Sequence, residues 1–159
     1  MDFIDRTLGP WGDPEPVFPG NDWSVPIRRG ISYWNNSAAP VMFVEGGHGG
    51  NRVSVGERYY LQRGVNNFGT VNVRDRTNTE LRSFHIDFNP IAVEHEVRVI
   101  RGNFSNIVAS TMAHELGHVI GLEDNPPNLN SIMNTNRNRD ILVSPTYFDA
   151  ESVSIIYRY

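Results

Sequence analysis

The amino-acid sequence predicts an α+β fold in which short strands precede one strong helix, and a second helix closes the chain. The predicted strands are short runs rich in β-branched and aromatic residues, separated by turn residues, over 31–34, 41–44, 51–55, 69–73, 83–88 and 93–100. Apolar and polar residues alternate most clearly at Val71 and Val73 and at Phe84, Ile86 and Phe88. A weaker pattern favours one or two helical turns over 57–63.

The strongest helix is predicted over 105–120, where apolar residues recur at helical spacing. Asn103 or Ser105 can cap its first turn, and Gly121 can end it, because glycine tolerates the left-handed backbone common at that point. The terminal helix is predicted over 147–157. Thr146 and Asp149 have the spacing of a capping box at its start.

The chain of 159 residues is long enough for one domain and leaves little room for a second. Residues 1–26 are rich in Pro and Gly and are expected to form an extended N-terminal arm, which Trp11, Phe18 and Trp23 can pin to the rest. Residues 27–159 are expected to form the single folded domain.

Composition excludes several classes of function. The formal net charge of −4 gives no sign of nucleic-acid binding, which usually needs a basic surface. The absence of cysteine excludes a disulfide scaffold, a thiol nucleophile and a Cys-ligated metal. No apolar run is long enough to cross a bilayer, so no membrane partner is expected. The first twenty residues lack the apolar segment of a signal peptide.

The stretch from His114 to Asp124, HELGHVIGLED, carries the chemistry. His114 and His118 are four residues apart on the predicted helix, so both imidazoles lie on one face and can reach one zinc ion. Glu115 is turned by about 100° from His114 and can lie beside the metal as a general base. Gly121 lets the chain leave the helix sharply, so that Asp124 can return as the third ligand. Glu123 is the competing candidate, and the register after Gly121 favours Asp124.

HExxHxxG with a ligand at the next third position resembles the zinc signature of the metzincin peptidases. Most metzincins have His as the third ligand, and the Asp found here resembles the aspartate variant typified by the snapalysins. Ser131, Ile132, Met133 and Asn134 fit the methionine turn beneath the metal, and residues 145–157 are similar to the matrixin C-terminal helix. The resemblance implies a twisted, mostly parallel sheet over the active-site helix, a loop-rich C-terminal part and a terminal helix. It also implies a long helix after the first strand, and the sequence indicates none between Trp34 and Gly69.

The resemblance implies a zinc-dependent endopeptidase with one catalytic Zn²⁺, in which a zinc-bound water attacks the peptide bond and Glu115 is the general base. Tyr147, rather than Tyr157, is the expected hydrogen-bond donor to the oxyanion, because Thr135 occupies the usual tyrosine position. The substrate is a protein or peptide, bound along a sheet edge at 69–75 or 83–88. The alternatives are a catalytically inactive zinc-stabilised binding module and a zinc exopeptidase or amidase. Retention of Glu115 favours the endopeptidase, because a structural zinc needs no general base.

Partners and location follow from the same resemblance. It implies an extracellular protein, while the chain itself leaves a cytoplasmic location open. A propeptide or a proteinaceous inhibitor is a further candidate partner, and a monomer is expected. A Ca²⁺ site has no support in the sequence. His48 is interpreted as a loop residue, and His85 and His95 as structural residues in strands.

Overall fold

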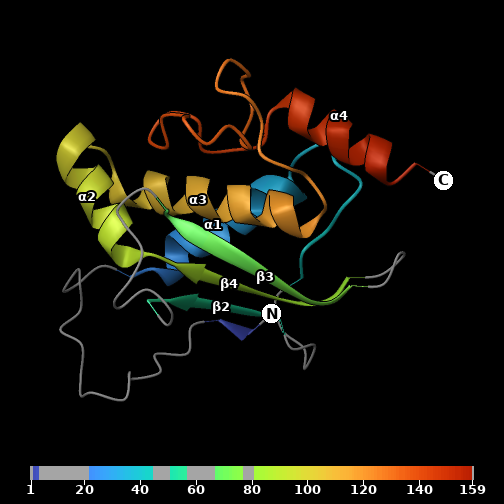
Figure 1. Ribbon diagram of the computed structural model, residues 1–159, viewed down its shortest axis with the longest axis horizontal. Helices are drawn as coiled ribbons and strands as arrows, with labels where there is room; N and C mark the ends of the chain where they lie inside the picture. The colour runs from blue at the N-terminus through green and yellow to red at the C-terminus, as the bar shows by residue number, and fades with distance from the viewer. Residues whose placement is uncertain (1, 4–21, 45–50, 57–66, 77–80, 159) are drawn as a thin grey trace.

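The computed structural model describes residues 2–3, 22–44, 51–56, 67–76 and 81–158. In chain order the described elements are strand β1 (Asp2–Phe3), helix α1 (Ser24–Asn35), strands β2 (Arg52–Val55), β3 (Gly69–Arg76) and β4 (Leu81–Phe88), and helices α2 (Pro90–Ile100), α3 (Phe104–Val119) and α4 (Tyr147–Ile156) (Figure 1). The α+β class is therefore confirmed. The predictions for 57–63, His48, Trp11 and Phe18 lie outside the described residues.

The sheet has the order β1-β2-β4-β3. β1 and β2 pair in parallel, as do β2 and β4, while β3 runs antiparallel to β4 with Gly69 opposite Phe88. Two of the three pairings are thus parallel. β3 is the edge strand on one side of the described sheet, and β4 is an interior strand.

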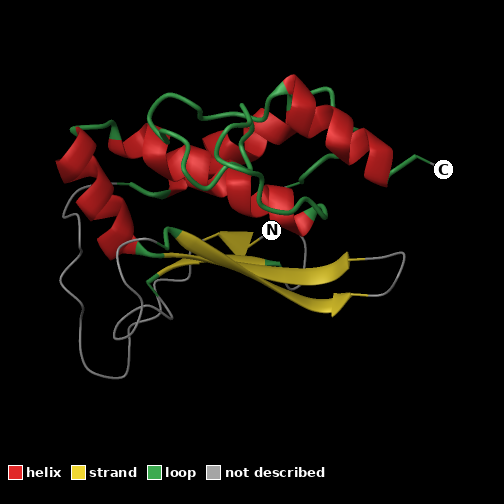
Figure 2. Ribbon diagram, turned by 45° about the horizontal axis from the view of Figure 1, so that its top comes forward, coloured by secondary structure: helices red, strands yellow, loops and turns green. Residues whose placement is uncertain are grey.

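The helices lie together on one side of the sheet, and long loops cover α3 on the side away from the strands (Figure 2). The loop-rich stretch between α3 and α4 runs from Ile120 to Thr146 and contains one isolated parallel bridge, between Asn125 and Asn134. Among the described residues, no helix combines the length and apolarity that crossing a membrane would require.

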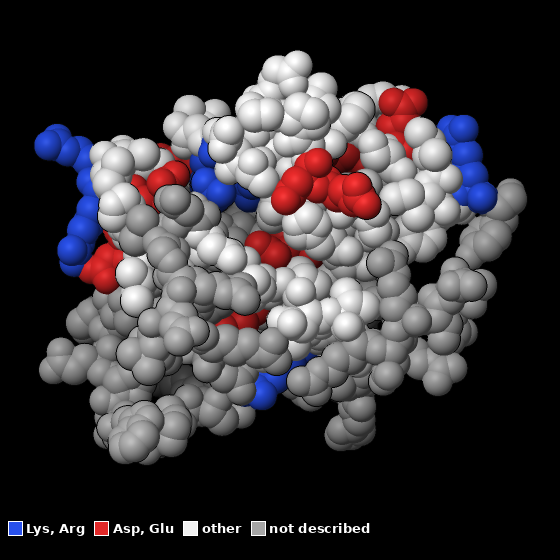
Figure 3. Space-filling view, in the orientation of Figure 1, with Lys and Arg blue, Asp and Glu red and all other residues white. Residues whose placement is uncertain are grey.

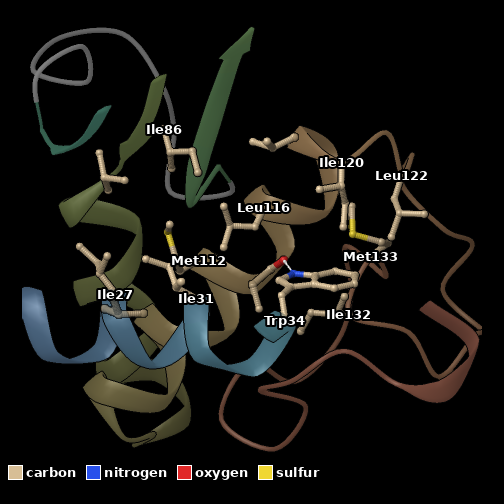
Figure 4. Close-up of a cluster of buried hydrophobic side chains, with 14 of the residues drawn as sticks. Ile27, Ile31, Trp34, Ile86, Met112, Leu116, Ile120, Leu122, Ile132 and Met133 are labelled. Carbon is tan, nitrogen blue, oxygen red and sulfur yellow. Dashed lines mark hydrogen bonds between the residues drawn. The ribbon is translucent and has the colours of Figure 1, made fainter. Parts of the chain in front are cut away.

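One hydrophobic core lies between the sheet and the helices. Its largest fully buried side chains include Phe88 of β4. They also include Trp34 of α1, Met112 and Leu116 of α3, and Met133 of the following loop (Figure 4). The Trp34 Nε1 donates a hydrogen bond to the Ala113 carbonyl at 2.7 Å, which fixes α1 against α3. The two helices can approach closely because Gly30 has no side chain: a Cβ there would lie 2.6 Å from the Met112 Cβ.

The strand predicted over 31–34 is wrong, because these residues belong to α1. Ile27, Ile31 and Trp34 recur at intervals of four and three residues, which places them on one buried face of a helix. The resemblance implied a helix after the first strand. The structure has a helix after its first strand, α1 after β1. This helix precedes the interval between Trp34 and Gly69 in the chain. α1 begins at Ser24, so the predicted boundary between arm and domain at 26/27 falls inside a helix.

The strand predicted over 41–44 is also wrong, because these residues form no strand. The Asn35 side chain holds the backbone of Phe43 instead: Phe43 N–H donates to Asn35 Oδ1 at 2.8 Å, and Asn35 Nδ2 donates to the Phe43 carbonyl at 2.8 Å. A single side chain at the end of α1 thus takes up the hydrogen bonds that a neighbouring strand would need.

The third error concerns 93–100, predicted as a strand and observed as the greater part of α2. Asn89 caps this helix by accepting hydrogen bonds from the amides of Ile91 and Ala92, and Pro90 occupies the first helical position. His95 therefore lies on a helix rather than in a strand. His85 does lie in β4 and is buried, with its Nε2 2.7 Å from the Ser54 hydroxyl.

The remaining elements agree with the sequence. β3 and β4 contain the strands predicted there, β2 begins one residue later than predicted, and α3 and α4 match the two predicted helices within one residue at each end. Asn103 caps α3, Gly121 has a φ of 98°, and Thr146 and Asp149 form the predicted capping box. Trp23, at the start of α1, packs its ring edge-on against Phe88 and Phe104.

Candidate metal centre

Four residues of α3 form a stripe along one side of a cleft of about 640 Å³: Thr111, His114, Glu115 and His118. Their spacing of three, four and seven residues puts them on one face over two helical turns. β3 forms the opposite wall through Gly69, Thr70, Val71 and Val73, and the loop after Met133 closes the cleft with residues 135–137 and Arg139. Figure 3 shows this face, with acidic atoms near its centre and basic atoms beside them.

His114, His118 and Asp124 converge on one point. The Asp124 Oδ1 lies 3.4 Å from the His114 Nε2 and 3.5 Å from the His118 Nε2, and all three ligand atoms lie within 4.8 Å of one another. Each imidazole also places its Nδ1 against a backbone carbonyl: His114 at 3.0 Å from Ile132 O, and His118 at 2.9 Å from Leu122 O. These bonds put the proton on Nδ1 and leave the Nε2 lone pairs directed at the shared point.

The donor set therefore fits a metal ion. Two neutral imidazoles and a carboxylate are ordinary metal ligands, and their second nitrogens are already bonded to carbonyl groups. Burial is the main cause that lowers the pKa of His114 well below its usual value, and the nearby Arg137 lowers it further. His114 consequently stays neutral, which is the protonation state that binds a metal. The three residues predicted as ligands can hold an ion together.

Asp124 reaches this point because backbone bonds fix the chain after α3. The amides of Gly121 and Leu122 bond to the carbonyls of His118 and Gly117, and the Asn125 amide bonds to the Met133 carbonyl at 3.0 Å. Asp124 lies between these two anchored points, with its side chain 55% exposed. Glu123, the competing ligand candidate, is exposed and lines no part of the cleft.

Glu115 lies at the base of the cleft with 5% of its surface exposed. Burial raises its pKa from 4.5 to about 7, and Arg137 opposes this shift. The carboxylate packs against β3, because a Cβ on Gly69 would lie 2.8 Å from Glu115 Oε1. A carboxyl group with a pKa near neutrality, next to a metal-binding group, can both accept and release a proton.

Met133 packs against the turn of α3 that carries His114 and His118. It is fully buried, and a Cβ on Gly117 would lie 2.3 Å from its sulfur. Gly117 stands between His114 and His118, so a side chain at this position of α3 would have to displace Met133. The predicted methionine turn therefore packs against the helix turn that carries the metal ligands.

Asp149 of α4 holds this turn in place. Its carboxylate accepts hydrogen bonds from the Ser131 hydroxyl and from the Ile132 amide at 2.9 Å. The same carboxylate accepts from the Thr146 amide at 2.7 Å as part of the capping box. Since the Ile132 carbonyl bonds His114, one buried carboxylate connects the terminal helix to a metal ligand. The sequence revealed the capping box but not this second use of Asp149.

Arg137 and Arg139 are the site residues that sequence reasoning missed. Arg137 is 6% exposed, and it donates to the Ser110 hydroxyl and carbonyl, both at 3.1 Å, and to the Asn134 carbonyl at 3.0 Å. Burial lowers its pKa to about 9, so it remains a cation at neutral pH. Its Nη1 is 3.2 Å from His114 Nδ1, and because that nitrogen carries a proton, this contact is not a hydrogen bond.

Tyr147 is not brought to the site. It stands at the first position of α4, its side chain is 78% exposed, and it does not line the cleft. Tyr157 also lies outside the cleft, and no tyrosine of the described residues lines it. The predicted role of Tyr147 therefore has no geometric basis, because the cap at Thr146 directs the first helical residue outward.

Comparison with protein-family models, curated proteins and solved structures finds no match to this chain. The assignment of a function therefore depends on the geometry of the cleft.

Proposed function

We propose that this chain is a zinc-dependent endopeptidase, with His114, His118 and Asp124 as the metal ligands and Glu115 as the general base. The observation that carries the proposal is the position of Glu115. A buried carboxyl with a pKa of about 7 lies in the same cleft as a three-residue metal-binding group. A purely structural metal site gains nothing from such a group and usually has four protein ligands.

Zinc is the proposed ion for two reasons. Zinc–nitrogen and zinc–oxygen bonds of about 2.1 Å in tetrahedral geometry separate two ligand atoms by about 3.4 Å. The Asp124 Oδ1 lies 3.4 and 3.5 Å from the two imidazole nitrogens. Two nitrogen ligands also disfavour Ca²⁺ and Mg²⁺, which prefer oxygen.

Zinc held by His114, His118 and Asp124 would supply the Lewis acidity that the reaction needs. The chain supplies the proton transfers. Glu115 accepts the proton of the attacking water and then donates it to the leaving amine, a role that a pKa near 7 suits. Gly69 and β3 hold the carboxylate of Glu115 from the opposite side.

The peptide is proposed to bind in extended form along β3. This strand is an edge of the described sheet and lines the cleft, whereas β4 is covered by neighbours on both sides. Of the two sheet edges considered from the sequence, only β3 is therefore available for strand addition.

We also propose that the chain is a metzincin of the aspartate variant. The support is the combination of Asp124 as third ligand, the buried Met133 beneath Gly117, and a mostly parallel sheet with an antiparallel edge strand along the cleft. An extracellular location remains part of this proposal.

The test is cleavage of internally quenched peptides with both ends blocked, by zinc-loaded protein. The Glu115→Gln variant is expected to lose about two to four orders of magnitude in kcat while it still binds one zinc per chain. Glu123→Gln is the matched control, because its exposed carboxyl lies outside the cleft and its removal leaves cleavage unchanged. Equal rates for Glu115→Gln and the unmodified chain would refute the mechanism. Zinc binding without any cleavage would indicate the binding module, and cleavage restricted to peptides with free ends would indicate an exopeptidase.

A further inference from the structure

Arg139 lies in the part of the cleft beside Phe68, its inner end, and its ion pair with Glu96 is long. The Arg139 side chain is 12% exposed and lines the cleft beside Phe68, with its guanidinium carbon 3.7 Å from the centre of the Phe68 ring. Its Nη2 donates to the Thr135 carbonyl at 3.1 Å. Its Nε is buried and has no hydrogen-bond partner. The nearest carboxylate of the described residues, that of Glu96, is 3.9 Å from Nη1, which is too long for a hydrogen bond.

Arg137 adds a second positive charge to the same end. Its three hydrogen bonds to acceptors of the described residues go to neutral groups, Ser110 and Asn134, and no described carboxylate lies within 4.0 Å of it. Two buried guanidinium groups two residues apart repel each other, and the charge of Arg139 adds to the burial that lowers the pKa of Arg137. Burial of such a pair is costly unless an anion compensates it.

From this arrangement we infer that the inner end of the cleft binds a carboxylate group of the substrate, received by Arg139 and supported by the charge of Arg137. A carboxylate accepts two parallel hydrogen bonds from a guanidinium, and it would satisfy the unused Nε of Arg139. The Phe68 ring covers a face of the guanidinium, and at its edge Nη2 bonds the Thr135 carbonyl while Nε has no partner.

The substrate class that follows is an acidic peptide. The same cleft is lined by Glu115 and by both arginines, so a peptide with its scissile bond at Glu115 lies within reach of the two guanidinium groups. The carboxylate is either an acidic side chain close to the scissile bond or a free C-terminus. The position of the scissile bond rests on the proposed peptidase function, whereas the binding of the carboxylate does not.

The experiment uses two end-blocked peptides that differ only by Glu or Gln next to the scissile bond, and a third, neutral peptide with a free C-terminal carboxylate. Cleavage is measured as kcat/KM with zinc-loaded protein. Binding of the same peptides to the Glu115→Gln variant is measured by fluorescence anisotropy, which requires no turnover. The variants are Arg139→Met, which keeps an apolar stem on Phe68, and Arg139→Lys. Arg98→Met is the control, because Arg98 bonds Glu94 on the exposed side of α2.

The Glu peptide is expected to be preferred over the Gln peptide by about tenfold to a hundredfold, the range of a charged hydrogen-bonded contact. Arg139→Met is expected to bring the ratio close to one, Arg139→Lys to restore part of it, and Arg98→Met to leave it unchanged. Glu96→Gln is expected to increase the preference, because it removes the competing carboxylate.

The outcomes separate the two proposals. Arg139-dependent binding of the Glu peptide without any cleavage would support the carboxylate site and reject the peptidase. Cleavage without preference, or a preference that survives in Arg139→Met, would overturn the carboxylate site and leave the peptidase standing. An Arg139-dependent preference for the free C-terminus over the acidic side chain would identify the C-terminal carboxylate as the source.

Discussion

The two walls of the cleft are built in different ways. The sheet wall, β3, is held by regular antiparallel hydrogen bonds to β4 over the whole length from Gly69 to Arg76. The helix-and-loop wall places its functional groups through single side chains, Asn134 and Arg137 in the stretch without regular structure and Asp149 in α4. Backbone pairing distributes its support over many equivalent bonds, whereas each side chain of the loop wall has a specific set of partners.

This difference predicts where the molecule is sensitive. Substitutions in the loop wall should change stability and metal binding together, because the same bonds hold the loop and the ligands. Substitutions in the sheet wall should change the position of substrate and of Glu115 with little effect on stability. Four predictions test this contrast, in order of decreasing effect on the free energy of unfolding.

The largest effect is expected for Asp149→Ala. This change leaves the amides of Ile132 and Thr146 and the Ser131 hydroxyl without their acceptor in a buried place, at a cost of about 3–5 kcal/mol. Chemical denaturation and metal titration should both report the loss, since Ile132 also orients His114. Glu151→Ala, an exposed position of the same helix, is the control. A stable variant with unchanged metal affinity would show that the loop wall does not depend on Asp149.

The second prediction concerns Glu115 in metal-free protein. Burial raises the pKa of Glu115 to about 7, so the folded chain binds this proton more tightly than the unfolded chain. The contribution of Glu115 to stability is therefore fully present below pH about 4.5 and is lost as the pH rises through about 7. Glu115→Gln removes this dependence, and by pH 8 the variant should have gained about 2–3 kcal/mol relative to the unmodified chain. Denaturation series at several pH values in chelator measure the difference, and a gap that stays constant from pH 5 to pH 8 would contradict the shift.

The third prediction is a double-mutant cycle at the methionine turn. Gly117→Ala places a Cβ 2.3 Å from the Met133 sulfur and is expected to cost about 1–3 kcal/mol by overpacking. This cost exceeds the gain of about 1 kcal/mol that alanine brings to a helix interior. In a Met133→Ala background the clash is gone, so the same substitution should stabilise the protein. A destabilising effect of equal size in both backgrounds would mean that Gly117 has another role.

The smallest effect on stability is expected in the sheet wall. Gly69→Ala should cost less than about 1 kcal/mol, because its Cβ meets the end of the Glu115 side chain, which can move. Hydrolysis should nevertheless fall by about tenfold to a hundredfold, because the general base is displaced. Thermal unfolding and kcat/KM on one preparation measure the two effects. Unchanged kcat/KM would show that β3 does not position Glu115.

The same contrast explains what could be predicted from the sequence. The ligand residues, the helix that carries them and the capping box follow local rules of spacing, and each is found where those rules place it. Asp149, Arg137 and Arg139 act through partners far along the chain, such as Ser110, Ile132 and Phe68, and no local pattern reveals those partners. The prediction for Tyr147 follows from the family resemblance alone, and the structure does not bring this side chain to the cleft.

The two helices predicted as strands show the limit of composition. Val93, Val97, Val99 and Ile100 favour a strand by residue type, but Asn89 and Pro90 before them form a typical helix start. In α1, the helical spacing of Ile27, Ile31 and Trp34 was present in the sequence, and the proline and glycine at positions 26 and 30 obscured it. In both cases position-specific signals outweigh the β propensity of the residues.

The shared carboxylate of Asp149 also has a dynamic consequence. Fraying of α4 and loosening of the turn that bonds His114 break hydrogen bonds to the same side chain, so the two motions are thermodynamically linked. An ion bound by His114 then slows the opening of a helix that contributes no ligand to it. Amide hydrogen exchange at residues 150–153 should therefore slow when the metal is added. Exchange in the C-terminal helix would then report whether the metal site is occupied.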